Sequence, residues 1–304
     1  MNDGAYRDRL SREARHWGER LKVEALERHA WLDHPVIARH YQERALIDGQ
    51  PWPQWVAARL GGPAERSLEL GCGSAGLSLK LFDAGVTSWI DGVDVSADRV
   101  AAGEFGRLQR HAPGRFDVAD ANSVKLPESR YDLIFASHSF HHFEALEHVM
   151  TQVRRALTPR GLFVLEEYVG PTQFQWTDRQ LAIVRELMPL LPQRYRTFRS
   201  GVVKPYEGRP TVRDVMAVSP FESIRSSEIV PLFSTYFEVV KTRPLCGTLQ
   251  HLLYNGIIHN FVDGNEDAAR YLNAIRQVED ALVDGGLLPS DFQLLVGSHG
   301  NRPR

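Results

Sequence analysis

The stretch "RSLELGCGSAGLSL", from Arg66 to Leu79, decides the fold class of this chain. Gly71, Gly73 and Gly76 fit the spacing G-x-G-x-x-G, which is typical of the turn between strand and helix in a dinucleotide-binding unit. Such turns hold a pyrophosphate at the N-terminus of the helix. Glu69, however, lies two residues before the first glycine, where its carboxylate would repel phosphate. The stretch therefore favours a ligand that carries positive charge in place of phosphate.

Strands and helices alternate after this stretch. Segments rich in Val, Ile, Leu and Phe are separated by helical segments, which predicts βαβ units and a parallel, doubly wound α/β sheet. The predicted strands cover residues 66–71, 89–96, 115–121, 131–139 and 161–170, and the predicted helices cover residues 75–84, 97–109 and 143–157.

Two further acidic residues follow the next predicted strands. Asp94 lies 18 residues after Gly76, close to the roughly twenty residues expected for an acid that hydrogen-bonds ribose hydroxyls. Asp120 follows the third strand, where its side chain can accept a hydrogen bond from an adenine amine. Dinucleotides and S-adenosylmethionine both contain adenosine, but S-adenosylmethionine has a sulfonium and an ammonium group and no phosphate. Glu69 therefore favours S-adenosylmethionine.

Over about residues 64–168 the chain resembles the class I S-adenosylmethionine-dependent methyltransferases of small-molecule type. The resemblance rests on "LELGCGSAG", "IDGVDVS", "VADANSVKLPESRYDLIFASHSFHHF" and "RRALTPRGLFVLEE", in this order. It implies a seven-stranded, mostly parallel Rossmann-like sheet, S-adenosylmethionine as cofactor and S-adenosyl-L-homocysteine as product. It also implies two further strands in residues 236–245 and 292–299, the last one inserted antiparallel.

The resemblance implies a set of cofactor-binding residues at the strand ends. They are Glu69, Gly71, Cys72, Gly73, Asp94, Val95, Asp120, Ala121 and Ser137. The sequence departs from the family pattern at Ala75, which stands where a third glycine is usual. Alanine costs little there if the backbone is already helical, so we expect the turn to tolerate it.

Four regions are predicted along the chain. Residues 1–60 form an N-terminal helical cap, and residues 61–170 form the cofactor-binding core. Residues 171–235 form a helical insertion that acts as a lid, and residues 236–304 complete the sheet with a further helical insertion. Cap and lid would cover the carboxyl ends of the strands, where open α/β sheets bind ligands.

An apolar stripe marks the first predicted helix. Leu10, Ala14, Trp17 and Leu21 recur at steps of three and four residues. The sequence "LDHP" ends this helical region because the residue before a proline is pushed out of the helical conformation. A second helix is predicted from Pro35 to Ile47, followed by a loop over "DGQPWPQW".

Histidines follow the fourth predicted strand in "SHSFHHF", beside the expected position of the transferable methyl group. His138, His141 and His142 are candidates for a general base, because a histidine near neutral pKa can accept a proton. His138 is the first choice by its nearness to the strand end, and His142 is the second. In the alternative interpretation one of them packs against the nucleoside or caps the next helix.

Of the two glutamates that end the fifth predicted strand, at most one can point toward the acceptor. Alternation along a strand puts Glu166 and Glu167 on opposite faces, and we expect Glu167 on the substrate side with catalytic potential. An ion pair with an arginine of the lid is the competing interpretation. Tyr168 and Trp176 are the predicted substrate contacts. No metal is expected, since His251, His259 and Asp263 would make only a sparse site.

Composition excludes several other classes of protein. The 304 residues carry a formal net charge of −2, which does not favour nucleic acid or an anionic membrane as partner. The N-terminal segment is charged and lacks the apolar core of a signal peptide, and no apolar run approaches the length of a membrane span. The two cysteines lie far apart. We expect a cytoplasmic protein, and its oligomeric state cannot be read from the sequence.

The sequence therefore predicts methyl transfer to a small-molecule acceptor, most simply a hydroxyl oxygen of a sugar or natural-product intermediate. A module of the same fold that binds S-adenosylmethionine or a nucleoside without methylating anything is the first alternative. An NAD-dependent oxidoreductase is the second, which the glycine spacing allows and Glu69 disfavours.

Overall fold

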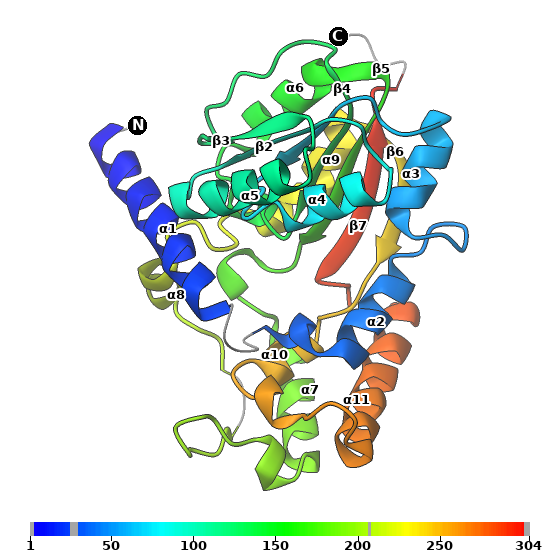
Figure 1. Ribbon diagram of the computed structural model, residues 1–304. Coiled ribbons are helices and arrows are strands. Elements are labelled where there is room, and N and C mark those ends of the chain that lie inside the picture. The colour runs from blue at the N-terminus through cyan, green and yellow to red at the C-terminus, as the bar shows by residue number, and fades with distance from the viewer. Residues whose placement is uncertain (1–2, 25–29, 206–207, 301–304) are drawn as a thin grey trace.

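A computed structural model describes residues 3–24, 30–205 and 208–300. Within these residues the strands form a seven-stranded sheet in the order β3-β2-β1-β4-β5-β7-β6 (Figure 1). The strands are β1 (Ser67–Leu70), β2 (Ile90–Asp94), β3 (Gly114–Val118), β4 (Tyr131–Ser137), β5 (Leu157–Tyr168), β6 (Glu238–Pro244) and β7 (Phe292–Ser298). Only β7 runs antiparallel to its neighbours β5 and β6. The predicted mostly parallel sheet and its antiparallel last strand are confirmed.

Helices cover both faces of the sheet. The helices are α1 (Asp3–Glu24), α2 (Pro35–Arg44), α3 (Trp52–Leu60), α4 (Gly76–Asp83), α5 (Ala97–Gln109), α6 (Leu146–Ala156), α7 (Asp178–Leu187), α8 (Val212–Val218), α9 (Ile229–Tyr236), α10 (Gln250–Tyr254) and α11 (Glu266–Asp284). In Figure 1, α4 and α5 cross one face of the sheet, and α9 lies on the other. The loop predicted over residues 48–55 is shorter than expected, because α3 already begins at Trp52.

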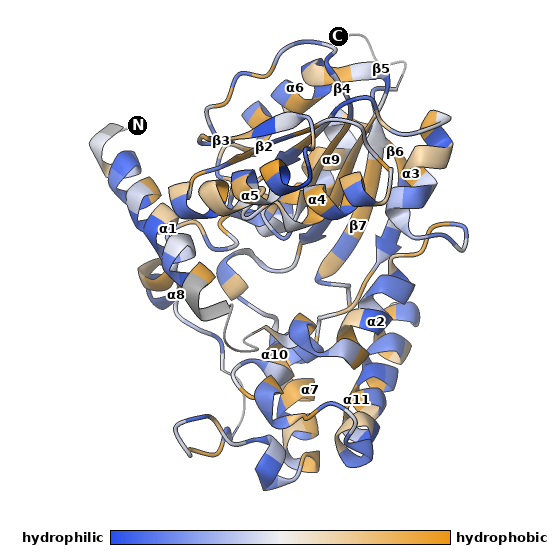
Figure 2. Cartoon of the chain, viewed as in Figure 1, coloured by the Kyte–Doolittle hydropathy of each residue, from blue (hydrophilic) through white to orange (hydrophobic). Residues whose placement is uncertain are grey.

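The two faces of the central strands bury different sets of side chains. Along β4, Leu133 and Phe135 point to the face that packs on α3, whereas Ile134 points to the face that packs on α6 and α9. Phe163 of β5 shares the second face and packs its ring against Phe233 of α9. Figure 2 shows that β7 and α9 are mostly hydrophobic, while α1 is mostly hydrophilic.

The fifth strand begins earlier than predicted. Leu157 already pairs with Tyr131, and the next pair joins Leu162 to Leu133. The extra residues between the two pairs, including Pro159, leave the ladder as an irregularity in β5. Proline has no backbone N–H to donate to a strand ladder, so the break in pairing falls at a residue that could not donate this hydrogen bond.

A second group of helices lies beyond the carboxyl ends of the strands. Figure 1 shows α2, α7, α10 and α11 together below the sheet. Their apolar side chains join the core on the α3 face of the sheet through residues such as Leu181, Leu252 and Ile275. The predicted lid thus has a helical body in the expected region, whereas α9, at the end of residues 171–235, packs on the sheet itself. The domain boundaries and the lid function remain predictions.

Replacing Phe233 with alanine tests whether α9 is part of the core. Phe233 is fully buried, and we expect its truncation to lower the free energy of unfolding by about 3–5 kcal/mol, measured by chemical denaturation. The control is Phe105→Ala in α5, whose side chain is 65% exposed and whose loss should change stability by less than about 0.5 kcal/mol. Equal effects of the two substitutions would contradict this account of the core.

Candidate cofactor and catalytic site

A cavity of about 340 Å³ lies at the carboxyl ends of β1, β2 and β4. All nine residues predicted to bind the cofactor line this cavity: Glu69, Gly71, Cys72, Gly73, Asp94, Val95, Asp120, Ala121 and Ser137. The carboxyl ends of parallel strands meet at one edge of a sheet, which is why residues spread over the chain come together here. Their roles as ligands of a cofactor stay predictions.

The glycine turn is held against the loop that follows β4. Gly71 has φ 68°, and a Cβ on it would lie 2.5 Å from the Cβ of Ser139, a distance that no real contact reaches. Ser139 in turn donates its hydroxyl to the carbonyl oxygen of Leu70 at 2.7 Å. Gly73 has φ 51°, and its N–H donates to the Asp94 carboxylate at 2.9 Å. The turn therefore requires glycine at Gly71, whereas at Gly73 only the positive φ favours it.

Ala75 does not have the backbone conformation that we expected. Its φ of 59° and ψ of 23° are left-handed, not right-handed helical, so the expected tolerance for alanine rested on the wrong conformation. An alanine in this region costs about 1–2 kcal/mol relative to a right-handed one. The methyl group of Ala75 is fully buried and packs where Gly103 of α5 leaves space for it. The strain is therefore offset by a close helix contact.

Glu69 is buried at the end of β1. The residue is 4% exposed, and its Oε2 accepts hydrogen bonds from the Ser78 hydroxyl at 2.6 Å and the Ser78 N–H at 3.3 Å. Burial raises the pKa of Glu69 to about 8. No basic side chain contributes to that shift, so a cationic group in the cavity would be its first opposite charge.

Asp120 connects the cavity to the N-terminal helix. Its Oδ1 accepts the backbone N–H of Asn122 at 2.9 Å, and its Oδ2 accepts the hydroxyl of Tyr6 from α1 at 2.7 Å. Burial and the Asp120 carboxylate raise the pKa of Tyr6. The carboxylate oxygen that we predicted to face an adenine amine is thus shared with α1.

Helix α1 closes one side of the cavity. Leu10, Glu13 and Trp17 all line it. The Trp17 indole N–H donates to Glu13 at 2.7 Å, and the Trp17 carbonyl accepts from Arg99 of α5 at 2.8 Å. None of the three was among the predicted site residues. The stripe containing Leu10 and Trp17 was the signal that could have found two of them.

His138 lines the cavity at the end of β4 with a strained backbone. Its φ is 51°, in the left-handed region that non-glycine residues rarely adopt, and such strain clusters at functional sites. The side chain is 34% exposed. Its Nε2 lies 3.4 Å from the Tyr41 hydroxyl and 3.9 Å from Oε1 of Glu166. His138 therefore has both access to the cavity and partners that orient its ring.

His142 also lines the cavity, whereas His141 and Glu167 lie behind its wall. Glu167 is fully buried and accepts the backbone N–H groups of Ser139 at 2.9 Å and Phe140 at 2.6 Å, besides its contact with Nδ1 of His141. Burial alone would lower the pKa of His141, but Glu167 and a second carboxylate raise it to about 10. Glu167 therefore binds the loop after β4. It does not line the cavity, as we had expected, and its observed partners do not include an arginine of the lid.

Tyr168 and Trp176 lie in an aromatic cluster outside the cavity. Both rings contact Phe174 and His251, and Tyr168 also contacts Phe292 at a centroid distance of 5.3 Å. Burial lowers the pKa of His251 to about 4. The cluster continues to His138, whose ring lies 5.8 Å from that of Phe292. The predicted substrate contacts are therefore separated from the cavity by His138 and its aromatic neighbours.

Comparison with known proteins identifies a domain within this chain. Residues 68–163 match the model of a methyltransferase domain. The chain is 26% identical over 107 residues to the 27-O-demethylrifamycin SV methyltransferase of Amycolatopsis mediterranei (strain S699), which covers 34% of this chain and 39% of that protein. It is 24% identical over 165 residues to the fatty-acid O-methyltransferase of Mycolicibacterium smegmatis, which covers 53% of this chain and 58% of that protein. The chain thus matches less than two thirds of either relative.

A solved structure extends the likeness over nearly the whole chain. The geranyl diphosphate C-methyltransferase from Streptomyces coelicolor A3(2), in complex with Mg²⁺, geranyl diphosphate and S-adenosyl-L-homocysteine, superimposes with a TM-score of 0.55 at 16% identity. The alignment covers 96% of this chain and 98% of that one. At such low identity the likeness concerns the fold alone. Together with the matched domain, it means that this chain carries a class I S-adenosylmethionine-dependent methyltransferase domain, with S-adenosylmethionine as its cofactor.

Proposed function

We propose that this protein transfers the methyl group of S-adenosylmethionine to a hydroxyl oxygen of a small molecule with an apolar body. The observation that carries the proposal is a single cavity that joins the acids of the strand ends to His138. Among the described residues, no helix is long and apolar enough to span a membrane. Small acceptors also agree with the names of the relatives, a 27-O-demethylrifamycin SV methyltransferase and a fatty-acid O-methyltransferase.

The charge of the cavity lining fits the cofactor and opposes a dinucleotide. Four acidic side chains line the cavity, Glu13, Glu69, Asp94 and Asp120, against one arginine, Arg99. Burial raises the pKa of Glu69 to about 8, and even without Glu69 the acids outnumber the arginine three to one. A pyrophosphate would meet a field of its own sign, whereas a sulfonium and an ammonium group would meet the opposite one. The oxidoreductase alternative loses its support on this ground.

The cofactor supplies an electrophilic methyl group on a sulfonium. The protein has to align the acceptor with that carbon and keep water away, which contributes about 7–11 kcal/mol through positioning alone. The acceptor oxygen must also lose its proton, and a positioned base adds typically 10²–10⁴-fold, or about 3–5 kcal/mol. Positioning is the larger of the two contributions, and the base is the smaller one.

We assign His138 as the general base that takes the proton of the acceptor. It is the exposed histidine of the cavity, and Tyr41 and Glu166 flank its Nε2. With the cofactor bound, Nε2 of His138 would take the proton of the acceptor hydroxyl as its oxygen takes the methyl group, and the bond from the methyl carbon to the sulfonium sulfur would break to leave S-adenosyl-L-homocysteine. Glu166, itself fixed by the indole N–H of Trp52 at 2.8 Å, stabilises the imidazolium that results.

The aromatic cluster beyond His138 suggests the kind of acceptor. Trp176 and Phe174 stack with centroids 5.4 Å apart, and Tyr168 closes the cluster. If the helices below the sheet open to admit an acceptor, these rings offer an apolar wall next to the base. A hydroxylated lipid or polyketide-like molecule fits that wall better than a bare sugar. Assays with labelled S-adenosylmethionine against fatty acids, sterols, macrolides and phenols test this; cofactor binding without transfer to any of them would favour the non-methylating module.

Glu69→Gln tests the buried carboxyl through its pH dependence. In the free protein Glu69 is protonated below a pKa of about 8, and a bound cation favours its ionised form. The wild type should therefore gain affinity for S-adenosylmethionine as pH rises to about 8, more steeply than Glu69→Gln does. At pH 8 the variant should bind about tenfold or more weakly. Isothermal titration of both proteins across this range isolates Glu69, since the cofactor's own titration is common to both.

The same substitution has a defined effect on the stability of the free protein. The pKa of Glu69 is raised above its unfolded value of 4.5, so the folded state holds a proton that the unfolded state has lost. Wild-type stability should fall as pH rises from about 4.5 to 8, and the variant should lack this fall. Parallel stability profiles of the two proteins would show that Glu69 is not buried as described.

Gly71→Ala and Gly85→Ala form a matched pair that tests the turn. Both glycines have a positive φ, 68° and 67°, so both substitutions share a backbone strain of about 1–2 kcal/mol. Only at Gly71 would the new Cβ meet Ser139; at Gly85 nothing lies within 4 Å. Calorimetry should find cofactor affinity reduced at least tenfold in Gly71→Ala and unchanged in Gly85→Ala. Similar affinities in both variants would refute the close approach.

His138→Asn tests the base while respecting the left-handed backbone, which asparagine tolerates. We expect kcat to fall by about 10²–10⁴-fold with cofactor affinity unchanged. The control is His111→Asn, because His111 shares the φ of 51° but lies exposed after α5. A kcat for His138→Asn equal to that of the control would assign the proton to another group.

A further inference from the structure

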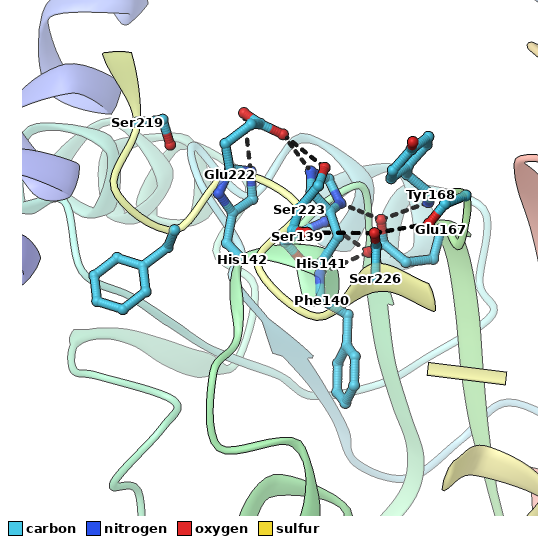
Figure 3. Close-up of polar contacts among 12 residues, drawn as sticks. Ser139, Phe140, His141, His142, Glu167, Tyr168, Ser219, Glu222, Ser223 and Ser226 are labelled. Carbon is cyan, nitrogen blue, oxygen red and sulfur yellow. Dashed lines mark hydrogen bonds and ion pairs between the residues drawn. The ribbon is translucent and has the colours of Figure 1, made fainter. Parts of the chain in front are cut away.

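We propose that His141, His142 and Glu222 form a binding site for one divalent transition-metal ion at the edge of the cofactor cavity. The three residues come from the segment after β4 and from the loop before α9, which Figure 3 shows facing one another. From the sequence we expected no metal, and the metal ligands weighed there were His251, His259 and Asp263.

The ligand atoms already converge. Nε2 of His141 lies 3.4 Å from Oε1 of Glu222, and Nε2 of His142 lies 3.9 Å from its Oε2. One ligand atom from each of the three residues falls within 4.8 Å of the other two. A tetrahedral ion with bonds of about 2.0–2.1 Å holds its ligand atoms roughly 3.3–3.4 Å apart. A small contraction of the cluster, without a change of fold, would bring it to that geometry.

A carboxylate stands behind each imidazole. Nδ1 of His141 contacts the buried Glu167, and Nδ1 of His142 lies 3.1 Å from Oε1 of Glu13. Metal-binding histidines typically have such a carboxylate on their other ring nitrogen, which fixes the tautomer and turns the free nitrogen toward the ion. Here both Nε2 atoms are turned toward the same third carboxylate, Glu222.

These outer carboxylates are themselves held in place. Glu167 accepts two backbone N–H groups of the loop after β4, and Glu13 accepts the Ser219 hydroxyl at 2.8 Å. The imidazoles are therefore positioned by a rigid surrounding. Both ring nitrogens of His142, in contrast, are buried without a hydrogen bond, on a side chain that is only 11% exposed; Nδ1 has its ion-pair contact with Glu13, and Nε2 lies 3.9 Å from Oε2 of Glu222. A buried polar atom without a hydrogen bond is costly, and a bound cation would satisfy it.

The donor set selects the class of metal. Two imidazoles and one carboxylate suit Zn²⁺, Fe²⁺ or Co²⁺, whereas Mg²⁺ and Ca²⁺ prefer oxygen ligands throughout. Three protein ligands leave at least one position open. His142 and Glu13 line the cofactor cavity, so the open position would face it. On the proposed methyl transfer, an acceptor oxygen bound there would lose its proton more readily.

Titration of the metal-free protein with Co²⁺ in the presence of S-adenosyl-L-homocysteine tests the site. We expect one equivalent to bind, with the visible absorption of a four- or five-coordinate Co²⁺ centre, and Zn²⁺ to displace it. Glu222→Gln should weaken Co²⁺ binding by about 100-fold or more, and Glu167→Gln by about 10–100-fold. His111→Asn, which alters an exposed histidine, should leave binding unchanged.

Several outcomes would overturn the site. One is the absence of a stoichiometric Co²⁺ complex in the wild type, and another is binding of Mg²⁺ as tight as that of Co²⁺. A third is a Glu222→Gln variant that binds both S-adenosyl-L-homocysteine and Co²⁺ as the wild type does. The wild-type titration decides even if a variant does not fold. Methyl transfer by protein that binds no metal would remove the metal proposal and leave the proposed function intact. Metal binding without methyl transfer to any acceptor would do the reverse.

Discussion

The buried carboxylate of Glu167 is the interaction on which the site depends. It accepts two backbone N–H groups from the loop after β4 and contacts His141, with no exposure to solvent. Removing one partner from such a buried pair costs about 3–5 kcal/mol, because the remaining charge is left uncompensated. These contacts therefore favour one conformation of the loop after β4. That conformation places His138 and His142 at the cavity and brings Ser139 against Gly71.

The N-terminal helix completes a site that the sheet alone leaves open. Tyr6 bonds to Asp120 on one side of the cavity, and Glu13 approaches His142 on the other. Burial would raise the pKa of Glu13, but His142 and Trp17 lower it. Both contacts join α1 to residues that the chain places more than a hundred positions later. Movement of α1 would thus open the Asp120 end and the histidine end of the cavity together.

Much of the cavity lining could be predicted because it depends on the order of strands and helices along the chain. Each acid, Glu69, Asp94 and Asp120, follows its own strand, and parallel strands bring their carboxyl ends to one edge without any knowledge of side-chain packing. Ala75 shows the limit of this reasoning. Ala75 has a left-handed backbone, and its methyl group packs against Gly103 of α5, where a Cβ would lie only 3.0 Å away. No pattern of neighbouring residues predicts this contact.

The candidate catalytic residues were harder to place for the same reason. Alternation put Glu166 and Glu167 on opposite faces, but it could not say that Glu167 would be bound by its own neighbouring loop. Glu222 was not singled out at all, since one glutamate in a proline-rich insertion has no spacing to mark it.

By itself, the sequence determined the order of strands and helices, the parallel sheet and the set of residues at its carboxyl edge, because hydrophobic periodicity and glycine spacing are properties of neighbouring residues. Only the tertiary structure decided which carboxylate faces which histidine. Those contacts join α1, the loop after β4 and the segment before α9, and their energies depend on burial and distance, which exist only once the chain has folded.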